Sequence, residues 1–208
     1  MRVIRREDSV FLNCPFDPEY KPLFDAIAFI VVLAGYKLRC ATERSDAGEQ
    51  RLTKIIELIK ASRYSIHDLS RTELDRSSGL PRFNMPIEVG IALGAKHLGT
   101  KTQRDHQMLV LDKEKYAYQK SASDLAGADI RAHANDQEKA IRAVRDFLSD
   151  HGNKGALKGA DFFITAFRAY EALLPRLLAD QHQKREDMTF VDQLRRIEQF
   201  TDSQADRP

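Results

Sequence analysis

The chain has 208 residues, of which 42% are hydrophobic and 31% are charged, and its formal net charge is +2. This composition is typical of a soluble globular protein, and the length suits one domain of ordinary size plus an appendage, or a single large domain, of which we expect the first. The small net charge gives no reason to expect a polyanion, so we expect no nucleic-acid partner. The two cysteines have no CxxC spacing, which argues against a disulfide framework and a zinc site.

The first residues, MRVIRREDSV, lack the apolar segment of a signal peptide. The apolar run at 26–33 is much too short to span a bilayer. We therefore expect a cytoplasmic protein with free thiols and no membrane partner.

Apolar runs and helical patterns alternate along the first part of the chain. The run VFLNC at 10–14 predicts a buried strand. Asp17 and Pro18 supply a capping side chain and an early proline for a helix that ends before Gly35. The remaining predicted elements, in chain order, are a strand at 36–41, a helix at 51–62, a strand at 64–69, a helix that carries Glu88, strands at 107–112 and 129–133, and a helix at 137–149.

This alternation predicts an α/β fold with a five-stranded parallel sheet between two layers of helices. Five strands suit the flavodoxin-like order 2-1-3-4-5. The glycine-rich stretch HGNKGALKG then predicts a linker, and helical patterns at 161–178 and 188–200 predict a C-terminal extension. The predicted units are therefore an α/β domain at 1–150, a helical extension at 151–200 and a disordered tail at 201–208.

Ligands of such sheets bind outside the carboxyl ends of the strands, where the strand order reverses. In the predicted order this point lies between the first and third strands. The ends of these strands and the start of the helix that carries Glu88 should converge there. The predicted substrate-binding residues are Asn13, Phe16, Asp68, Ser70, Asn84 and Met85.

Glu88 is the predicted catalytic residue because it continues an apolar stripe. It shares a helix face with Ile91, Ala92 and Ala95, which should face the core. The alternative is a surface carboxylate that complements the helix dipole.

The other two central residues also have structural alternatives. Asp68 has the position of a cap after a strand, and Asn13 that of a turn former close to Pro15.

The remaining reactive side chains predict no further site. His67 alternates away from Asp68 on a buried strand and is interpreted as a core histidine, and Cys14 and Cys40 as inert packing residues. No histidine spacing suggests a metal. Neither GxGxxG nor a Walker-type glycine loop occurs after the first strand, which argues against a nicotinamide dehydrogenase and an ATPase.

One carboxylate in a crevice, without a metal cluster or a nucleophile triad, suits cleavage of an N-glycosidic bond. The base leaves from an oxocarbenium-like transition state, which a single carboxylate can attack or stabilise. Asp68 would then hold a sugar hydroxyl or the leaving base. We expect no resident cofactor.

Two stretches resemble known families. VFLNCPFD is similar to the first strand and turn of TIR-like domains. YSIHDLS and MPIEVGIALGA resemble the strand and glutamate-bearing helix that TIR domains share with nucleoside 2-deoxyribosyltransferases. The resemblance covers roughly 10–148. It implies a flavodoxin-like fold and N-glycosidic cleavage of nucleosides or NAD, with Glu88 as the catalytic glutamate.

The resemblance has two departures. The transferases usually carry Asp-Gly-Thr before this helix, where this chain has LPRFNMP, and the TIR loop after the second strand is matched only in place, at 43–48. Bacterial TIR-like proteins often act in antiphage defence, which is implied here by kinship alone.

Two functions of different class therefore stay open. One is an enzyme that cleaves NAD or a related nucleotide. The other is a non-catalytic nucleotide sensor or interaction module, since TIR domains include scaffolds. The wide apolar face at 161–178 predicts docking onto the α/β domain, with self-association as the alternative.

Overall fold

The computed structural model describes residues 5–44, 46, 48–72, 83–120 and 122–205. The strands are β1 (Ser9–Asn13), β2 (Lys37–Cys40), β3 (Tyr64–Asp68), β4 (Gln107–Asp112) and β5 (Ile130–Ala132). The α-helices are α1 (Lys21–Leu33), α2 (Arg51–Lys60), α3 (Asn84–Leu98), α4 (Gln137–His151), α5 (Ala160–Ala179) and α6 (Phe190–Ala205). Short 3-10 turns lie at η1 (Arg6–Asp8), η2 (Ala117–Lys120), η3 (Ser123–Leu125) and η4 (Arg185–Asp187).

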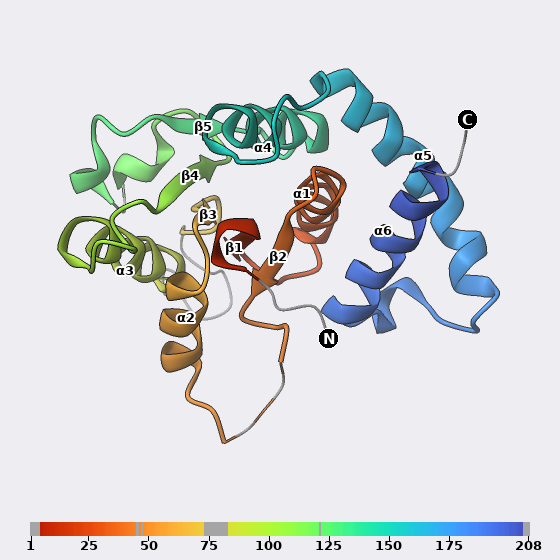
Figure 1. The fold of residues 1–208 in the computed structure, drawn as a ribbon, viewed down its shortest axis with the longest axis horizontal. Coiled ribbons are helices and arrows are strands. Elements are labelled where there is room, and N and C mark those ends of the chain that lie inside the picture. The colour runs from red at the N-terminus through yellow and green to blue at the C-terminus, as the bar shows by residue number, and fades with distance from the viewer. Residues whose placement is uncertain (1–4, 45, 47, 73–82, 121, 206–208) are drawn as a thin grey trace.

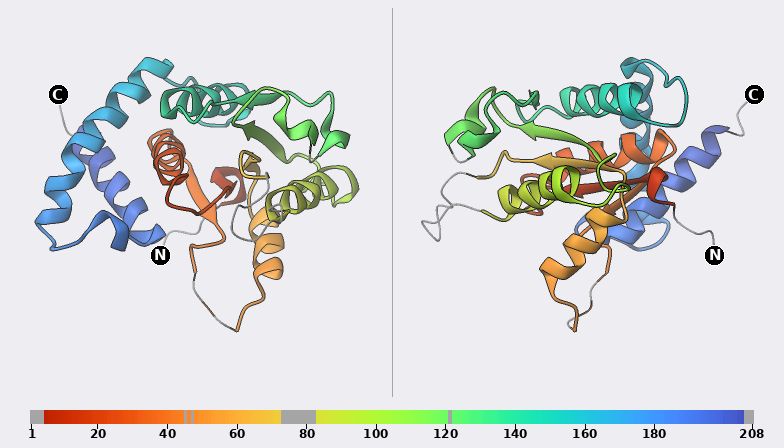
Figure 2. Two further views of the ribbon diagram at one scale, coloured as in Figure 1. Left: turned by 180° about the vertical axis from the view of Figure 1, so that it is seen from behind. Right: turned by 60° about the vertical axis from the view of Figure 1, so that its left-hand side comes forward.

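The strands form one parallel five-stranded sheet in the order β2-β1-β3-β4-β5. This confirms the predicted α/β class and the flavodoxin-like strand order. Helices α1 and α4 cover one face of the sheet and α2 and α3 cover the other (Figures 1 and 2). Every residue of the central strands β1 and β3 is buried, as strands covered on both faces require. The edge strand β2 is only partly buried.

Helix α1 begins later than the sequence predicts. Residues 17–20 form a turn in which the Asp17 carboxylate and carbonyl both accept from the Tyr20 backbone N–H, at 3.0 and 3.1 Å. The predicted capping side chain therefore closes this turn, and Pro22 rather than Pro18 lies in the first helical turn. The predicted stop is confirmed, because Gly35 has a φ of +83°, which favours glycine.

The C-terminal helices dock onto α1. Phe29 of α1 is fully buried and its ring lies 5.4 Å from Phe167, 5.2 Å from Tyr170 and 5.8 Å from Phe200. These side chains belong to the same core cluster as the sheet residues Val10 and Ile66. The predicted docking of the 161–178 face is therefore confirmed (Figure 1).

Helix α6 also corrects the prediction for the end of the chain. It continues to Ala205, so part of the tail predicted to be disordered from residue 201 is helical. Thr201 Oγ1 donates to the Ile197 carbonyl at 2.8 Å, which continues the helical turn. Residues 206–208 lie outside the described part of the chain.

A buried carboxylate fastens the C-terminal segment to α1. Asp25 is buried and accepts from Arg185 Nη2 at 2.7 Å and Gln193 Nε2 at 2.6 Å, and it also pairs with Lys21. Lys21 Nζ donates in turn to Gln193 Oε1 at 3.1 Å. Because a buried charge is tolerated only when it is paired and hydrogen-bonded, these contacts fix where α5 and α6 meet α1.

No helix in the described ranges is long and apolar enough to cross a membrane.

The docking of α5 and α6 predicts that truncating two different phenylalanines lowers the stability of the protein by different amounts. Truncating Phe29 to alanine removes a ring that α1, α5 and α6 all enclose, and should lower the free energy of unfolding by about 3–5 kcal/mol. The control Phe162→Ala removes a ring of a residue that is 49% exposed, and should cost about 1 kcal/mol or less. Urea unfolding followed by circular dichroism measures both. Equal losses would contradict the described packing.

Candidate functional site

The register between β1 and β3 decides which side chains share a face of the sheet. Asn13 is opposite His67 in the parallel pairing, and His67 is opposite Val110 of β4. Val110 packs in a cluster with Met85 and Val89 of α3. Because side chains alternate along a strand, Asn13 and His67 face α3 together.

Glu88 lies against this same face from the helix side. It is 5% exposed, and Ala92, one turn further along α3, packs with Phe11 of β1. Ile91 and Ala95 are partly buried against that cluster. The predicted apolar stripe that begins at Glu88 is therefore confirmed, and the alternative of a surface carboxylate is excluded.

Burial changes the acidity of Glu88. Removal from water raises the pKa of its carboxyl from 4.5 to about 7, and the positive charge of Arg51 acts in the opposite direction. Within the described ranges, no group donates a hydrogen bond to this carboxyl. Near neutral pH the protonated and ionised forms are therefore both populated, as acid–base and nucleophilic roles require.

Asn13 connects the end of β1 to the start of α3. It is 4% exposed, and its Nδ2 lies 3.0 Å from the Met85 carbonyl oxygen and 3.0 Å from His67 Nδ1. Met85 is one turn before Glu88 on the helix. The amide therefore fixes the first turn of α3 against the sheet on the side where Glu88 lies.

Asp68 faces the other side of the sheet. It is one residue beyond His67, and its partner Leu111 belongs to the core under α1 and α4. Side chains of consecutive strand residues point in opposite directions, so Asp68 cannot face α3. The expectation that Asn13, Asp68 and Glu88 converge in one crevice is therefore wrong for Asp68.

The surroundings of Asp68 hold it as an anion. Its Oδ2 accepts from the Tyr20 hydroxyl at 2.6 Å and lies 3.0 Å from His133 Nε2, and its Oδ1 accepts from the Ser70 backbone N–H at 2.8 Å. Full burial acts to raise the pKa of Asp68, but His133, Ser70 and Tyr20 together outweigh it and the pKa is lowered. The predicted capping role for Asp68 is thus also present, through Ser70.

The remaining predicted residues are placed in three environments. Ser70 is buried, and its backbone N–H contacts Asp68. Asn84 is exposed as the first residue of α3. The Met85 side chain is buried among apolar residues, so its carbonyl oxygen, rather than its thioether, belongs to the site.

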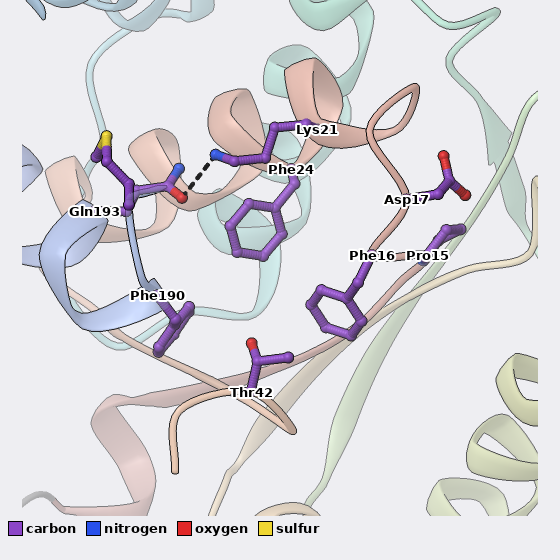
Figure 3. Close-up of a pocket in the computed structure, with 9 residues that line it drawn as sticks. Pro15, Phe16, Asp17, Lys21, Phe24, Thr42, Phe190 and Gln193 are labelled. Atoms are coloured by element: carbon purple, nitrogen blue, oxygen red, sulfur yellow. Dashed lines mark hydrogen bonds between the residues drawn. The ribbon is translucent and has the colours of Figure 1, made fainter. Parts of the chain in front are cut away.

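Phe16 lines a cleft of about 220 Å³ at the end of β1. The residue is 43% exposed, and its ring lies 5.9 Å from Phe24, which in turn lies 6.2 Å from Phe190 (Figure 3). Met188, Phe190 and Gln193 close the cleft from the C-terminal segment. This contribution from α6 was not predicted, because 188–200 is remote in sequence from the first strand.

Two residues around Asp68 were also missed by sequence reasoning. Tyr20 lies in the turn before α1 and His133 follows β5, so both reach Asp68 from distant parts of the chain. No local spacing in the sequence signals such a meeting. His67 is buried, with a pKa lowered by burial to about 3, which confirms its interpretation as a core histidine.

The described residues contain no cluster of three or more His, Cys, Asp or Glu side chains arranged for a metal. Cys14 and Cys40 are free thiols and both are buried. Of the segment LPRFNMP, where the chain departs from the deoxyribosyltransferases, residues 80–82 lie outside the described residues, whereas 83–86 lead into α3.

Comparisons with protein-family models, with curated proteins and with solved structures found no match for this chain.

The raised pKa of Glu88 predicts a pH-dependent effect of Glu88→Gln on stability. Between pH 4.5 and about 7 the folded state keeps a proton that the unfolded state has lost, so ionisation of Glu88 lowers stability as the pH rises. Glutamine cannot ionise. The stability of Glu88→Gln relative to wild type should therefore increase by up to about 3 kcal/mol from pH 5 to pH 8.

Urea unfolding of both proteins at the two pH values measures this difference. His67 and His106 have lowered pKa values in both proteins, so their pH-dependent contributions to the free energy of unfolding cancel in the difference. Glu57→Gln is the matched control, because the Glu57 side chain is exposed on α2 and should show no such increase. A pH-independent difference for Glu88→Gln would show that the carboxyl ionises as it does in water.

Proposed function

We propose that the protein binds a nucleotide or nucleoside at the carboxyl edge of its sheet and cleaves the N-glycosidic bond with Glu88. The observation that carries this proposal is a carboxyl that is buried at the strand-order switch, has a pKa of about 7, and has no hydrogen-bond donor among the described residues. Ligands of flavodoxin-like sheets bind at this edge. A carboxyl without a structural partner is available to a substrate.

The ionised form of Glu88 suits the bond-breaking step. As the bond between C1′ and the base breaks, its electron pair leaves with the base and positive charge develops on the sugar. A carboxylate on the opposite side stabilises that charge or forms a bond to C1′, and water then supplies the hydroxyl. Nicotinamide leaves NAD as a neutral molecule, so this substrate needs no acid on the leaving group. A leaving group that needs no acid suits a site in which one carboxyl has no hydrogen-bond donor among the described residues.

The cleft beside β1 supports the nucleotide part of the proposal. The rings of Phe16, Phe24 and Phe190 give it an apolar lining, and Lys21 adds a cation at one side (Figure 3). Aromatic rings pack well against planar bases. The cleft opens at the carboxyl edge, where β1 ends. One part of the nucleotide would occupy the cleft, and the sugar that reacts would lie toward α3.

A non-catalytic sensor is the second candidate function, and the composition of the cleft favours it. Met188, Phe190 and Gln193 contact any ligand held there, and Gln193 is also bound to Asp25 of α1. A ligand in the cleft would therefore touch the segment that fastens α5 and α6 to the α/β domain. Such contacts would transmit the binding of a ligand to a partner protein without any reaction of the ligand.

Release of free base distinguishes the two candidate functions. The wild-type protein, at low and high concentration, is incubated with NAD and with a panel of nucleosides, and the base is quantified by chromatography. The enzyme proposal expects release that increases with pH around a midpoint near 7, because the ionised carboxyl is the active form. Glu88→Gln should lower the rate at least about 100-fold.

Glu57→Gln is the control and should retain the wild-type rate. Equal release by wild type and Glu88→Gln would remove Glu88 from its proposed role. Absence of release at every concentration, combined with measurable nucleotide binding, would favour the sensor.

A further inference from the structure

A continuous chain of buried polar groups runs behind the proposed site along β3. Asn13 Nδ2 lies 3.0 Å from His67 Nδ1, and His67 Nε2 lies 2.8 Å from Ser65 Oγ. Ser65 Oγ lies 2.8 Å from His106 Nε2, and His106 Nδ1 lies 3.0 Å from the Ser62 carbonyl oxygen. All five residues are buried, so each link is made without competition from bulk water.

The orientation of the Asn13 amide is fixed by its second contact. The Met85 carbonyl oxygen can only accept a hydrogen bond, so the Asn13 atom 3.0 Å from it is the NH₂ group. That group also faces His67 Nδ1, which must therefore be the acceptor. In a neutral imidazole the ring proton then sits on Nε2.

The rest of the chain follows from this assignment. His67 Nε2–H donates to Ser65 Oγ, and the Ser65 hydroxyl hydrogen is left to donate to His106 Nε2. His106 then carries its proton on Nδ1 and donates it to the Ser62 carbonyl. Burial lowers the pKa of His67 to about 3 and that of His106 to about 4, so both rings are neutral at physiological pH.

This order leaves one group of Asn13 unused. Both amide hydrogens are engaged, by Met85 and His67, whereas Oδ1 accepts no hydrogen bond within the described ranges. The side chain is more than nine-tenths buried at the carboxyl end of β1, on the Glu88 side of the sheet. Oδ1 itself is not among the fully buried unpartnered atoms of the described residues, so solvent reaches it and a ligand donor can take the place of water there.

We propose that Asn13 Oδ1, held as an acceptor by the His67–Ser65–His106 chain, binds a ribose hydroxyl of the ligand and so selects for it. This inference rests on the proposed nucleotide site and names which part of the ligand meets Asn13. A neutral amide oxygen repels the oxygens of phosphate, which carry no proton to donate. A hydroxyl supplies that proton, so the sugar rather than the phosphate lies beside Asn13.

His67 is then a positioning residue. It does not touch the ligand, but it accepts from the Asn13 amide and so adds to the Met85 contact in opposing a 180° rotation, which would place NH₂ where Oδ1 lies. His67→Leu removes the acceptor, whereas His67→Gln offers one acceptor and one donor and can replace both contacts of the ring.

The test compares binding of adenosine, 2′-deoxyadenosine and 3′-deoxyadenosine by isothermal titration calorimetry. Wild type should bind at least one deoxy analogue about 10-fold more weakly than adenosine, a difference of about 1.4 kcal/mol. Asn13→Leu should bind all three equally, His67→Leu should discriminate less than wild type because only the Met85 carbonyl still holds the amide, and His67→Gln should restore the discrimination. Circular dichroism confirms that each variant is folded.

Nitrogen-15 NMR of the histidine rings provides a readout that needs no ligand. His67 should show its proton on Nε2 and His106 on Nδ1 at pH 7. The opposite tautomer for His67 would overturn the proposal, as would wild-type protein that binds none of the three nucleosides or binds them equally. Discrimination that depends on Asn13, in a protein that releases no base, would instead refute the enzymatic function and support this inference.

Discussion

The pairing of β1 with β3 is the constraint on which the site depends. Asn13 is opposite His67 in this register, and strand alternation then sends both side chains toward α3 and Asp68 toward α1. A shift by one residue would exchange the two faces and bury Asn13 under the wrong helices. The carboxyl edge therefore has two separate polar environments. One contains Glu88, Asn13 and His67, and the other is centred on Asp68.

The two carboxylates have opposite electrostatic surroundings. Asp68 has a tyrosine hydroxyl, a histidine and a backbone N–H around it, and these contacts keep its pKa low despite full burial. Glu88 is also buried, but among the described residues the charge of Arg51 alone acts against burial, and the pKa of Glu88 is raised to about 7. Satisfied carboxylates stabilise folds, whereas an unsatisfied one costs stability and is available to a ligand. This contrast makes Glu88 the centre of the candidate site, whereas Asp68 stabilises the fold on the other face of the sheet.

The sequence was sufficient for the features that depend on local pattern. Apolar runs and helical periodicity predicted the strands, their order and the buried stripe that begins at Glu88. The sequence could not fix the facing of Asp68, because that depends on the residue at which β1 and β3 come into register. Nor could it place Tyr20, His133 or Phe190, which reach the carboxyl edge only after the chain has folded. Helix α1 starts later than the sequence predicts because Asp17 closes a turn before the helix begins.

The central claim is that Glu88 is a buried carboxyl held near its titration midpoint at neutral pH. Carbon-13 NMR of side-chain carboxyls, with the Glu88 resonance assigned by its loss in Glu88→Gln, measures this directly between pH 3 and pH 9. The account expects a midpoint near 7. A midpoint near the ordinary value of 4.5 would contradict it.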